Sequence, residues 1–253
     1  MPIWRPLPRP GLARLNQFLL ALVFLTRLPL GRLLPATILP LSQSLWAFPL
    51  AGMLIGAIAA LPLWMMGPGL FPAALSVTLA VLLTGALHED ALADFTDAAG
   101  GRTREDRLRI MRDSAIGSYG VMALILSTAL RITAISQLTP MAVIAAAAAG
   151  RAAIVLVMAA LPAARQEGLG KSAGRPDAGN LALALIFGAF PLMLLGFPGF
   201  LALIAALIGT GWVIWRASSW IGGQTGDVLG SASVIAEVAV LSVLATVAQL
   251  AHS

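Results

Sequence analysis

The chain has no cysteine and only two histidines, His88 and His252, among its 253 residues. The absence of thiols excludes disulfides, thiolate metal ligands and cysteine nucleophiles. Two imidazoles are too few for a multi-histidine zinc site. Charged residues make up only 11% of the chain, whereas 59% of its residues are hydrophobic and its mean hydropathy is +0.91. A soluble core of this size would not need so few charges, so the composition predicts one polytopic membrane domain over residues 1–253.

Several apolar stretches approach the roughly 20 residues that a helix needs to cross about 30 Å of hydrocarbon. Turn-forming residues separate these stretches, and the fifth and sixth are short enough to form an oblique hairpin instead. A further apolar stretch, 15–26, is too short to span, and we expect an interfacial or re-entrant helix there rather than a cleaved signal peptide. The predicted fold class is therefore all-α, a bundle of about seven transmembrane helices. The predicted spans are 43–64, 70–88, 118–138, 141–161, 181–197, 199–215 and 231–250.

The basic residues indicate how these spans are oriented. If the N-terminus is cytoplasmic, every Lys and Arg outside a span lies on the cytoplasmic side, as the positive-inside rule expects. The loops 89–117, 162–180 and 216–230 then lie together on that side. The formal charge of +5 fits membrane orientation and the binding of anionic ligands better than binding of nucleic acid. Polar loops that converge at one membrane surface predict an active site for a soluble substrate.

An acidic cluster, Glu89, Asp90, Asp94 and Asp97, is the densest polar feature of the chain. The three aspartates follow i, i+4, i+7 spacing, which places them on one face of a helix. Carboxylate oxygens with scarcely any imidazole suit Mg²⁺, and also Mn²⁺. The alternative is a solvated helix end whose acids pair with the arginines of 102–112. We favour the metal site, because carboxylates this close repel one another unless a cation offsets them.

Five arginines follow within 102–114. Arg107 and Arg112 could present forked donors to phosphate oxygens, although a basic loop retained in the cytoplasm explains the charge equally well. Asp113 and Ser114 favour the functional interpretation, since a hydroxyl and charges on a tight backbone suit a nucleotide phosphate. Asp113 could instead orient Arg112.

Two later loops add candidates for the same site. Arg165 and Lys171 lie on a glycine-containing loop that could form a phosphate lid or an ordinary charged connector. Asp227 precedes the last predicted span and is a candidate for a further metal or ribose contact.

Three charged residues fall inside predicted spans: Arg131, Arg151 and Glu237. A charge at that depth costs several kcal/mol unless it is paired or hydrated. We expect internal ion pairing, and substrate binding fits these residues equally well. His88 could act as a general base for a hydroxyl group, or could make only a local hydrogen bond.

Sequence blocks along nearly the whole chain resemble the adenosylcobinamide-GDP ribazoletransferase family, also called cobalamin (5′-phosphate) synthase. The blocks HEDxLAD and RIMRDSxIGxYG are the most specific of them. Ala91 and Ala98 stand where the family usually has glycine, which affects the ligand geometry expected of the acidic helix. The blocks are FLTRLPL (24–30), WAFPLAGMLIG (46–56), TGALHEDALADFTDAAGG (84–101), REDRLRIMRDSAIGSYGVMAL (104–124), GR (150–151), ARQEGLGK (164–171) and GDVLGS (226–231).

The resemblance implies an Mg²⁺-dependent enzyme of the bacterial inner membrane. Such an enzyme joins adenosylcobinamide-GDP to α-ribazole, or to α-ribazole 5′-phosphate, and releases GMP. Its partners would be these substrates and the lipid bilayer, with a second copy of the chain or other corrinoid-pathway proteins as further candidates, and no nucleic acid.

Our own hypothesis, made with this reaction in view, assigns roles to the candidate residues. Carboxylates would hold the metal ion, basic residues would neutralise phosphate oxygens, and an acidic or imidazole side chain would accept the hydroxyl proton. The metal ligands would be Asp90, Asp94, Asp97 and Asp227; the substrate-binding residues Arg107, Arg112, Asp113, Ser114, Arg151, Arg165, Lys171 and Glu237; and the catalytic residues His88, Glu89 and Asp94.

Two other classes of protein remain as alternatives. A transporter would use Arg131, Arg151 and Glu237 as coupling charges, with discontinuous helices around a site near the midplane. A phosphotransferase acting on CDP-activated alcohols would also carry carboxylates on a helix. Its acid spacing and its glycine–arginine pattern are not reproduced here.

Overall fold

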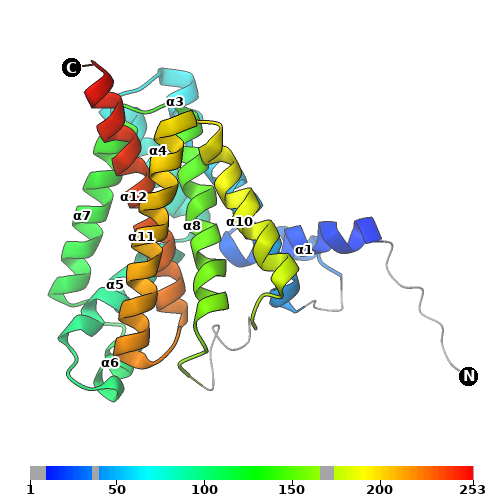
Figure 1. Ribbon diagram of the computed structural model, residues 1–253, viewed down its shortest axis with the longest axis vertical. Coiled ribbons are helices and arrows are strands. Elements are labelled where there is room, and N and C mark those ends of the chain that lie inside the picture. The colour runs from blue at the N-terminus through cyan, green and yellow to red at the C-terminus, as the bar shows by residue number, and fades with distance from the viewer. Residues whose placement is uncertain (1–9, 36–39, 166–173, 253) are drawn as a thin grey trace, which may run out of the picture.

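The computed structural model describes residues 10–35, 40–165 and 174–252, and it is a helical bundle (Figure 1). In these ranges, extended backbone pairs only at an isolated bridge between Ala163 and Gln224. The all-α prediction is confirmed. The elements are α1 (Pro10–Leu25), η1 (Leu30–Leu33), η2 (Leu41–Ala47), α2 (Phe48–Ala59), α3 (Leu61–Met66), α4 (Leu70–Thr84), α5 (Leu87–Asp97), η3 (Ala98–Gly100), α6 (Arg104–Ile110), α7 (Ser118–Ile135), α8 (Pro140–Ala160), α10 (Ala178–Met193), α11 (Gly196–Ile221) and α12 (Gly226–His252).

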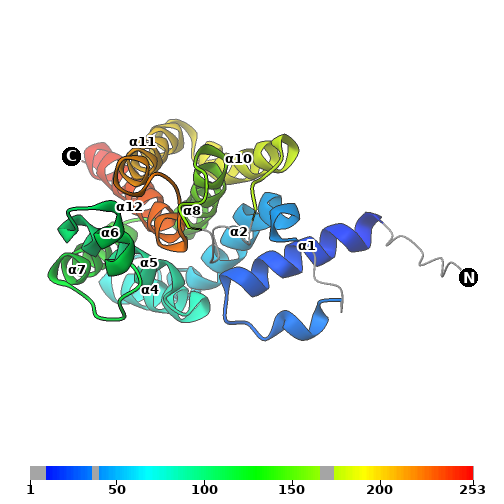
Figure 2. The same cartoon turned by 90° about the horizontal axis from the view of Figure 1, so that it is seen from below.

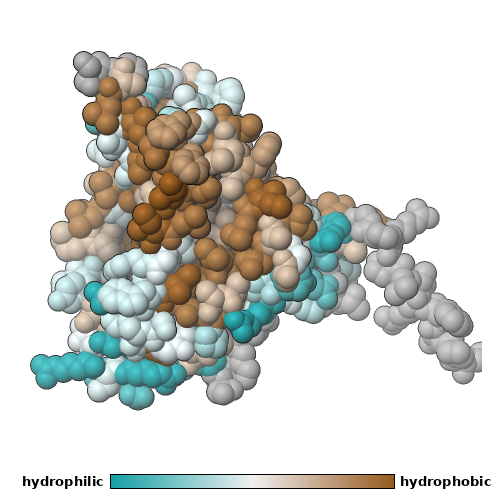
Figure 3. All heavy atoms as spheres, in the orientation of Figure 1, coloured by the Kyte–Doolittle hydropathy of each residue, from teal (hydrophilic) through white to brown (hydrophobic). Residues whose placement is uncertain are grey.

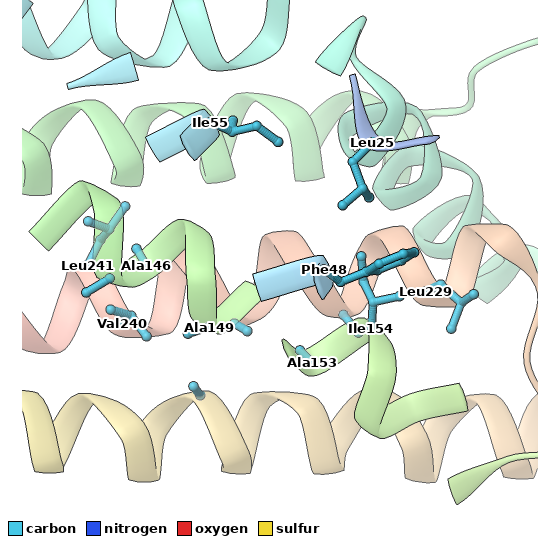
Figure 4. Packing of buried hydrophobic residues seen from close by; sticks show 14 of the residues in the cluster. Leu25, Phe48, Ile55, Ala146, Ala149, Ala153, Ile154, Leu229, Val240 and Leu241 are labelled. Carbon is cyan, nitrogen blue, oxygen red and sulfur yellow. The ribbon is translucent and has the colours of Figure 1, made fainter. Parts of the chain in front are cut away.

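Helix α8 forms the centre of the bundle and packs against α2, α10, α11 and α12. Small residues make this possible, because they let helix backbones approach closely. A Cβ atom on Gly52 would lie 2.5 Å from the carbonyl oxygen of Ala147, and one on Gly56 would lie 2.8 Å from the Cα of Ile144. Figure 4 shows the side chains of this core, contributed by helices far apart in the sequence.

Five helical segments are long and apolar enough to cross a membrane: Leu41–Met66, α7, α8, α11 and α12. Large apolar side chains are exposed on α11, among them Phe200, Ile208 and Trp215. Hydrophobic atoms cover much of the upper part of the face shown in Figure 3. Hydrophilic atoms gather at the lower end of that view, around α6. The chain is therefore a multi-pass membrane protein.

All seven predicted spans coincide with helices, but their lengths differ from the prediction. The predicted span 181–197 corresponds to α10, which has 16 residues, and 199–215 lies inside α11, which has 26. The prediction of two equally short spans is wrong for α11. The prediction of a loop over 216–230 is also wrong, since α11 continues to Ile221 and α12 begins at Gly226. Hydropathy detects where a helix leaves the lipid but not where the helix ends.

The predicted span 70–88 is broken. Helices α4 and α5 meet at an angle of 89°. They add a sixth membrane crossing only if the bent pair is counted as a single span. Gly85 and Ala86 at the break both have left-handed backbone conformations, with φ of 64° and 58°. Such a conformation is easy for glycine and strained for alanine. The backbone N–H of Arg27 donates to the carbonyl of Leu83 at 2.7 Å, so the chain after α1 packs against the break.

Helix α1 runs across the direction of the long helices, at about mid-height on the right of Figure 1. It contacts η1, η2 and α2. The indole N–H of Trp46 donates to the side chain of Gln17 at 2.7 Å, and the Arg14 guanidinium lies 5.1 Å from the centre of the same ring system. A helix lying across the bundle fits the expected interfacial segment.

Candidate active site

Segments from three parts of the chain converge at the end of the bundle shown in Figure 2. Helix α5 packs against the start of α12, and α6 packs against the end of α11. The guanidinium of Arg104 donates to the carbonyl of Ile221 at 2.9 Å and to that of Ala164 at 2.7 Å. Arg165 donates to the carbonyl of Leu108 at 2.9 Å. Arginines thus tie α6 to 162–165 and to the α11–α12 turn, in addition to any contact with substrate.

Two carboxylates from different segments, Asp90 on α5 and Asp227 on α12, line one cavity. The two helices approach closely because Gly230 has no side chain where the methyl group of Ala91 lies. The Ser231 hydroxyl strengthens this contact by donating to the carbonyl of Ala91 at 2.9 Å. Alanine at position 91 is therefore accommodated by glycine at position 230.

Asp94 lies close enough to the other acids for their charges to interact. Burial, followed by the negative charges of Asp227, Asp90 and Asp97, raises the pKa of Asp94 to about 7, against the opposing positive charge of Arg165. Asp94 lies on α5, outside the five long apolar helices. Mutual repulsion of this kind is relieved when a cation binds among the carboxylates.

Asp97 points toward a different element from its neighbours. Its two carboxylate oxygens accept hydrogen bonds from the backbone N–H groups of Gly117, at 2.7 Å, and Gly120, at 2.8 Å, in the first turn of α7. A Cβ atom on either glycine would collide with the carboxylate. The glycines of the IGSYG block therefore make room for a cap, and Asp97 serves to hold α7 against α5.

The charged residues inside the bundle form a buried cluster that we call the inner ion cluster: Glu89, Arg131, Arg151 and Glu237. Arg131 donates to Glu89 at 2.8 Å and lies 4.0 Å from Glu237, while Arg151 pairs with Glu237. The expected internal ion pairing is confirmed. Glu89 belongs to this cluster, although the sequence groups it with the acids of the surface site.

His88 lies between the inner ion cluster and the surface site. It is 4% exposed, and neither of its ring nitrogens has a hydrogen-bond partner among the described residues. It lines the cavity that contains Asp90 and Asp227, and it also lines a second cavity of about 40 Å³ beside the inner ion cluster. A buried imidazole without a partner is available to a bound substrate.

The remaining candidates have varied environments. Arg112, Asp113 and Ser114 are exposed in the turn between α6 and α7, where Asp113 accepts a hydrogen bond from the N–H of Ala115 at 3.1 Å. The guanidinium of Arg107 lies 5.3 Å from the centre of the Trp220 ring system. Lys171 lies outside the described residues, so its predicted role stays a prediction.

The oxygen donors available to Mg²⁺ at this site are carboxylates from α5 and α12. Among the described residues, no three carboxylates or imidazoles are arranged as a preformed ion site. Mg²⁺ usually takes one or two carboxylates and completes its shell with waters and substrate phosphates, which Asp90, Asp94 and Asp227 could satisfy. The residue types therefore fit this ion in the presence of a phosphate ligand. Asp97, engaged with α7, is left out of the proposed set.

The sequence did not draw attention to the apolar wall of the site. The cavity that contains Asp90 and Asp227 measures about 180 Å³ and is lined also by Leu25, Phe48 and Ile154. Leu25 and Phe48 belong to the blocks FLTRLPL and WAFPLAGMLIG, which had received no role. These two apolar blocks are the feature of the sequence that could have indicated the apolar wall of the site.

These features define a class of protein: a polytopic membrane protein with a carboxylate and arginine site where several helices end. The chain belongs to the cobalamin-5-phosphate synthase family, whose model matches residues 17–245. It is 42% identical over 243 residues to the adenosylcobinamide-GDP ribazoletransferase of Bradyrhizobium diazoefficiens, covering 89% of this chain and 92% of the relative. The protein of the same name from Mesorhizobium japonicum is 41% identical over 250 residues, covering 90% and 92%. No solved structure matches the chain.

Proposed function

We propose that this protein joins adenosylcobinamide-GDP to α-ribazole or α-ribazole 5′-phosphate and releases GMP. The observation that carries the proposal is that Asp90 and Asp227 line one cavity, with Asp94 and Arg165 close enough to interact electrostatically with them, in a chain related to these transferases over nearly its whole length. Membership of the family supplies the reaction, and the carboxylates and arginine supply suitable chemistry.

The reaction is a displacement at phosphorus. A ribazole hydroxyl oxygen forms a bond to the phosphorus attached to cobinamide, and the bond from that phosphorus to the bridging oxygen of the diphosphate breaks. GMP leaves with the bonding electron pair. Such a transfer depends on positioning and charge neutralisation more than on covalent help from the protein.

The residues of this chain have distinct tasks in that displacement. Arg165 would bind phosphate oxygens, since its guanidinium lies near Asp94 and Asp227. His88 is a better candidate than Glu89 to accept the hydroxyl proton, because Glu89 is paired with Arg131. Mg²⁺, or Mn²⁺, held by Asp90, Asp94 and Asp227, would supply positive charge to the diphosphate.

The cellular setting is part of the proposal. The inner membrane, with the N-terminus and the site on the cytoplasmic side, is favoured by the basic residues of the α5–α7 region and by the absence of Lys and Arg from the turns predicted at the opposite end. A second copy of the chain or other corrinoid-pathway proteins stay candidates as partners.

The experiment is a nucleotide-release assay on the purified protein in detergent. With Mg²⁺, adenosylcobinamide-GDP and α-ribazole, we expect stoichiometric GMP and the joined cobalamin product. With a CDP-activated alcohol in place of adenosylcobinamide-GDP, we expect no CMP. Release of CMP, or no GMP from protein of native stability, would overturn the proposal.

A further inference from the structure

The cavity beside Asp90 and Asp227 is lined by two chemically different kinds of residue, apolar and ionisable. Figure 4 shows Leu25, Phe48, Ile154 and Leu229 gathered in one region of the core, although they come from α1, α2, α8 and α12. All four line this cavity. The wall is therefore assembled from segments that are distant in the sequence and rigidly packed.

Aromatic side chains contribute to the apolar part of the lining. The rings of Phe24 and Phe48 stack with centroids 5.7 Å apart and an interplanar angle of 27°, and both residues line the cavity. Phe48 is 1% exposed, so its ring is held firmly by its neighbours. Flat aromatic groups pack favourably against such faces and edges.

The ionisable part of the lining consists of carboxylates and an imidazole. Asp90 and Asp227 line the same cavity, together with His88, whose nitrogens have no partner among the described residues. A ligand that fills the cavity must therefore combine an apolar part, to match the hydrophobic side chains, with hydroxyl or phosphate groups, to match the ionisable ones. A nucleoside with an apolar base has this character.

The size of the cavity indicates which part of the two substrates it can hold: the base of α-ribazole, the corrin macrocycle or the guanine. A cavity on the order of 150 Å³ holds a single benzene ring, and the volume here is about 180 Å³. One small aromatic base fits, whereas a corrin macrocycle does not. Guanine is also disfavoured, because its polar edge would lose hydrogen bonds against leucine, isoleucine and phenylalanine side chains.

We propose that this cavity is the subsite for the benzimidazole base of α-ribazole, with the ribose directed toward Asp90, Asp227 and His88. This inference rests on the proposed function and deepens it. It places the attacking hydroxyl beside the carboxylates that line the cavity, leaving the corrinoid and GDP groups to the open side near Arg165. It also makes α1 and α2 part of the substrate site.

A substitution that fills the cavity provides the first test. Ile154→Phe adds a ring to the apolar part of the lining, and we expect the KM for α-ribazole to rise about tenfold or more, with little change in the KM for adenosylcobinamide-GDP. The matched control is Leu244→Phe, an equally buried position on α12 that is about 14 residues, or roughly 21 Å, beyond the cavity. Leu244→Phe should leave both KM values unchanged.

A substitution that enlarges the cavity keeps the proposal testable if Ile154→Phe does not fold. Met158 lines the cavity and is 1% exposed, and Met158→Ala should improve use of a riboside with a bulkier, three-ring base relative to α-ribazole. A damaged protein would lose both substrates equally. A gain for the larger base therefore identifies the subsite.

The outcomes separate this inference from the proposed function. If the wild-type protein releases no GMP, the proposed function fails. If it is active but Ile154→Phe leaves the KM for α-ribazole unchanged, or Met158→Ala leaves base preference unchanged, only the subsite is overturned. Equilibrium dialysis of α-ribazole alone should show binding to the wild type and to Leu244→Phe, and weaker binding to Ile154→Phe.

Discussion

At the scale of single residues, three aspartates with helical spacing have different surroundings. Asp90 lines the cavity, Asp94 interacts with the other acids and with Arg165, and Asp97 accepts two backbone hydrogen bonds from α7. The i, i+4, i+7 pattern correctly predicts a shared helix, since all three lie on α5. It does not predict which neighbouring element each carboxylate meets, because that depends on packing between segments far apart in the sequence.

Asp94→Asn should separate activity from stability. We expect turnover to fall by about a hundredfold or more, because this change removes a charged group proposed to act on the diphosphate. Single-turnover GMP release at saturating substrate measures the loss. Turnover within about threefold of the wild type would contradict the role assigned to Asp94.

The raised pKa of Asp94 also predicts how stability varies with pH. An unfolded aspartate titrates near 3.9, whereas burial and neighbouring carboxylates raise the pKa of Asp94 to about 7. Between about pH 3.9 and pH 7, Asp94 is protonated in the folded state and ionised in the unfolded state. Its contribution to the free energy of unfolding is therefore present at low pH and is lost as the pH rises through about 7. Without Mg²⁺ at pH 8, Asp94→Asn should have a Tm equal to or above that of the wild type; a clearly lower Tm would contradict this.

Asp97→Ala should reduce stability without changing the metal requirement. Loss of a helix cap typically costs about 1–2 kcal/mol, and Asp97→Asn, which keeps one acceptor oxygen, should lose less. The Mg²⁺ concentration for half-maximal activity should stay near the wild-type value in both variants. A large increase in that concentration would instead make Asp97 a ligand.

At the scale of helices, the inner ion cluster joins α5, α7, α8 and α12 beneath the site. Gly150 lets α8 approach the side chain of Glu237, since a Cβ atom there would lie 2.8 Å from its Cγ. The charges in the predicted spans correctly indicated pairing. The partner Glu89 was not predictable, because only the sharp break at Gly85 and Ala86 turns it back toward Arg131.

Removing one partner of an ion pair in the inner ion cluster should reduce the free energy of unfolding more than replacing both partners does. Glu237→Leu leaves Arg151 buried without its partner, and we expect a loss of about 3–5 kcal/mol. The double variant Arg151→Met/Glu237→Leu should recover much of that loss, because no unpaired charge remains at this pair. Thermal inactivation in detergent measures both, and a double variant no more stable than Glu237→Leu would contradict the explanation.

At the scale of the whole molecule, the sequence predicts the membrane character well but overestimates the number of crossings. It predicts about seven, whereas five described helical segments, or six with the bent pair α4 and α5, are long and apolar enough. Hydropathy and turn residues locate every long helix, because lipid exposure imposes apolar runs of a fixed length. They do not show that α11 extends to Ile221, or that 216–230 is largely helical, because helices continue beyond lipid wherever protein contacts support them. The site was only partly predictable for the same reason: its apolar wall depends on tertiary packing.

The absence of native cysteine allows a direct test of orientation. Arg109 on α6 and Thr139 before α8 are both exposed. Helix α6 contacts Ala164, just beyond the C-terminal end of α8, whereas Thr139 precedes the N-terminal end of α8, so the two positions belong to opposite ends of the bundle. With a membrane-impermeant maleimide, Thr139→Cys should react in intact spheroplasts, and Arg109→Cys only after the membrane is opened. The reverse pattern would invert the proposed orientation.

The inner ion cluster contains two arginines and two glutamates, so it has no net charge when all four are ionised. A single charge moved across a potential of 100 mV changes its energy by about 2.3 kcal/mol, whereas a fixed and balanced group of charges does no such electrical work. In proteoliposomes, the rate of product formation should therefore be indifferent to an imposed voltage. If the protein were a transporter that used these residues as coupling charges, the imposed voltage would raise or lower its rate.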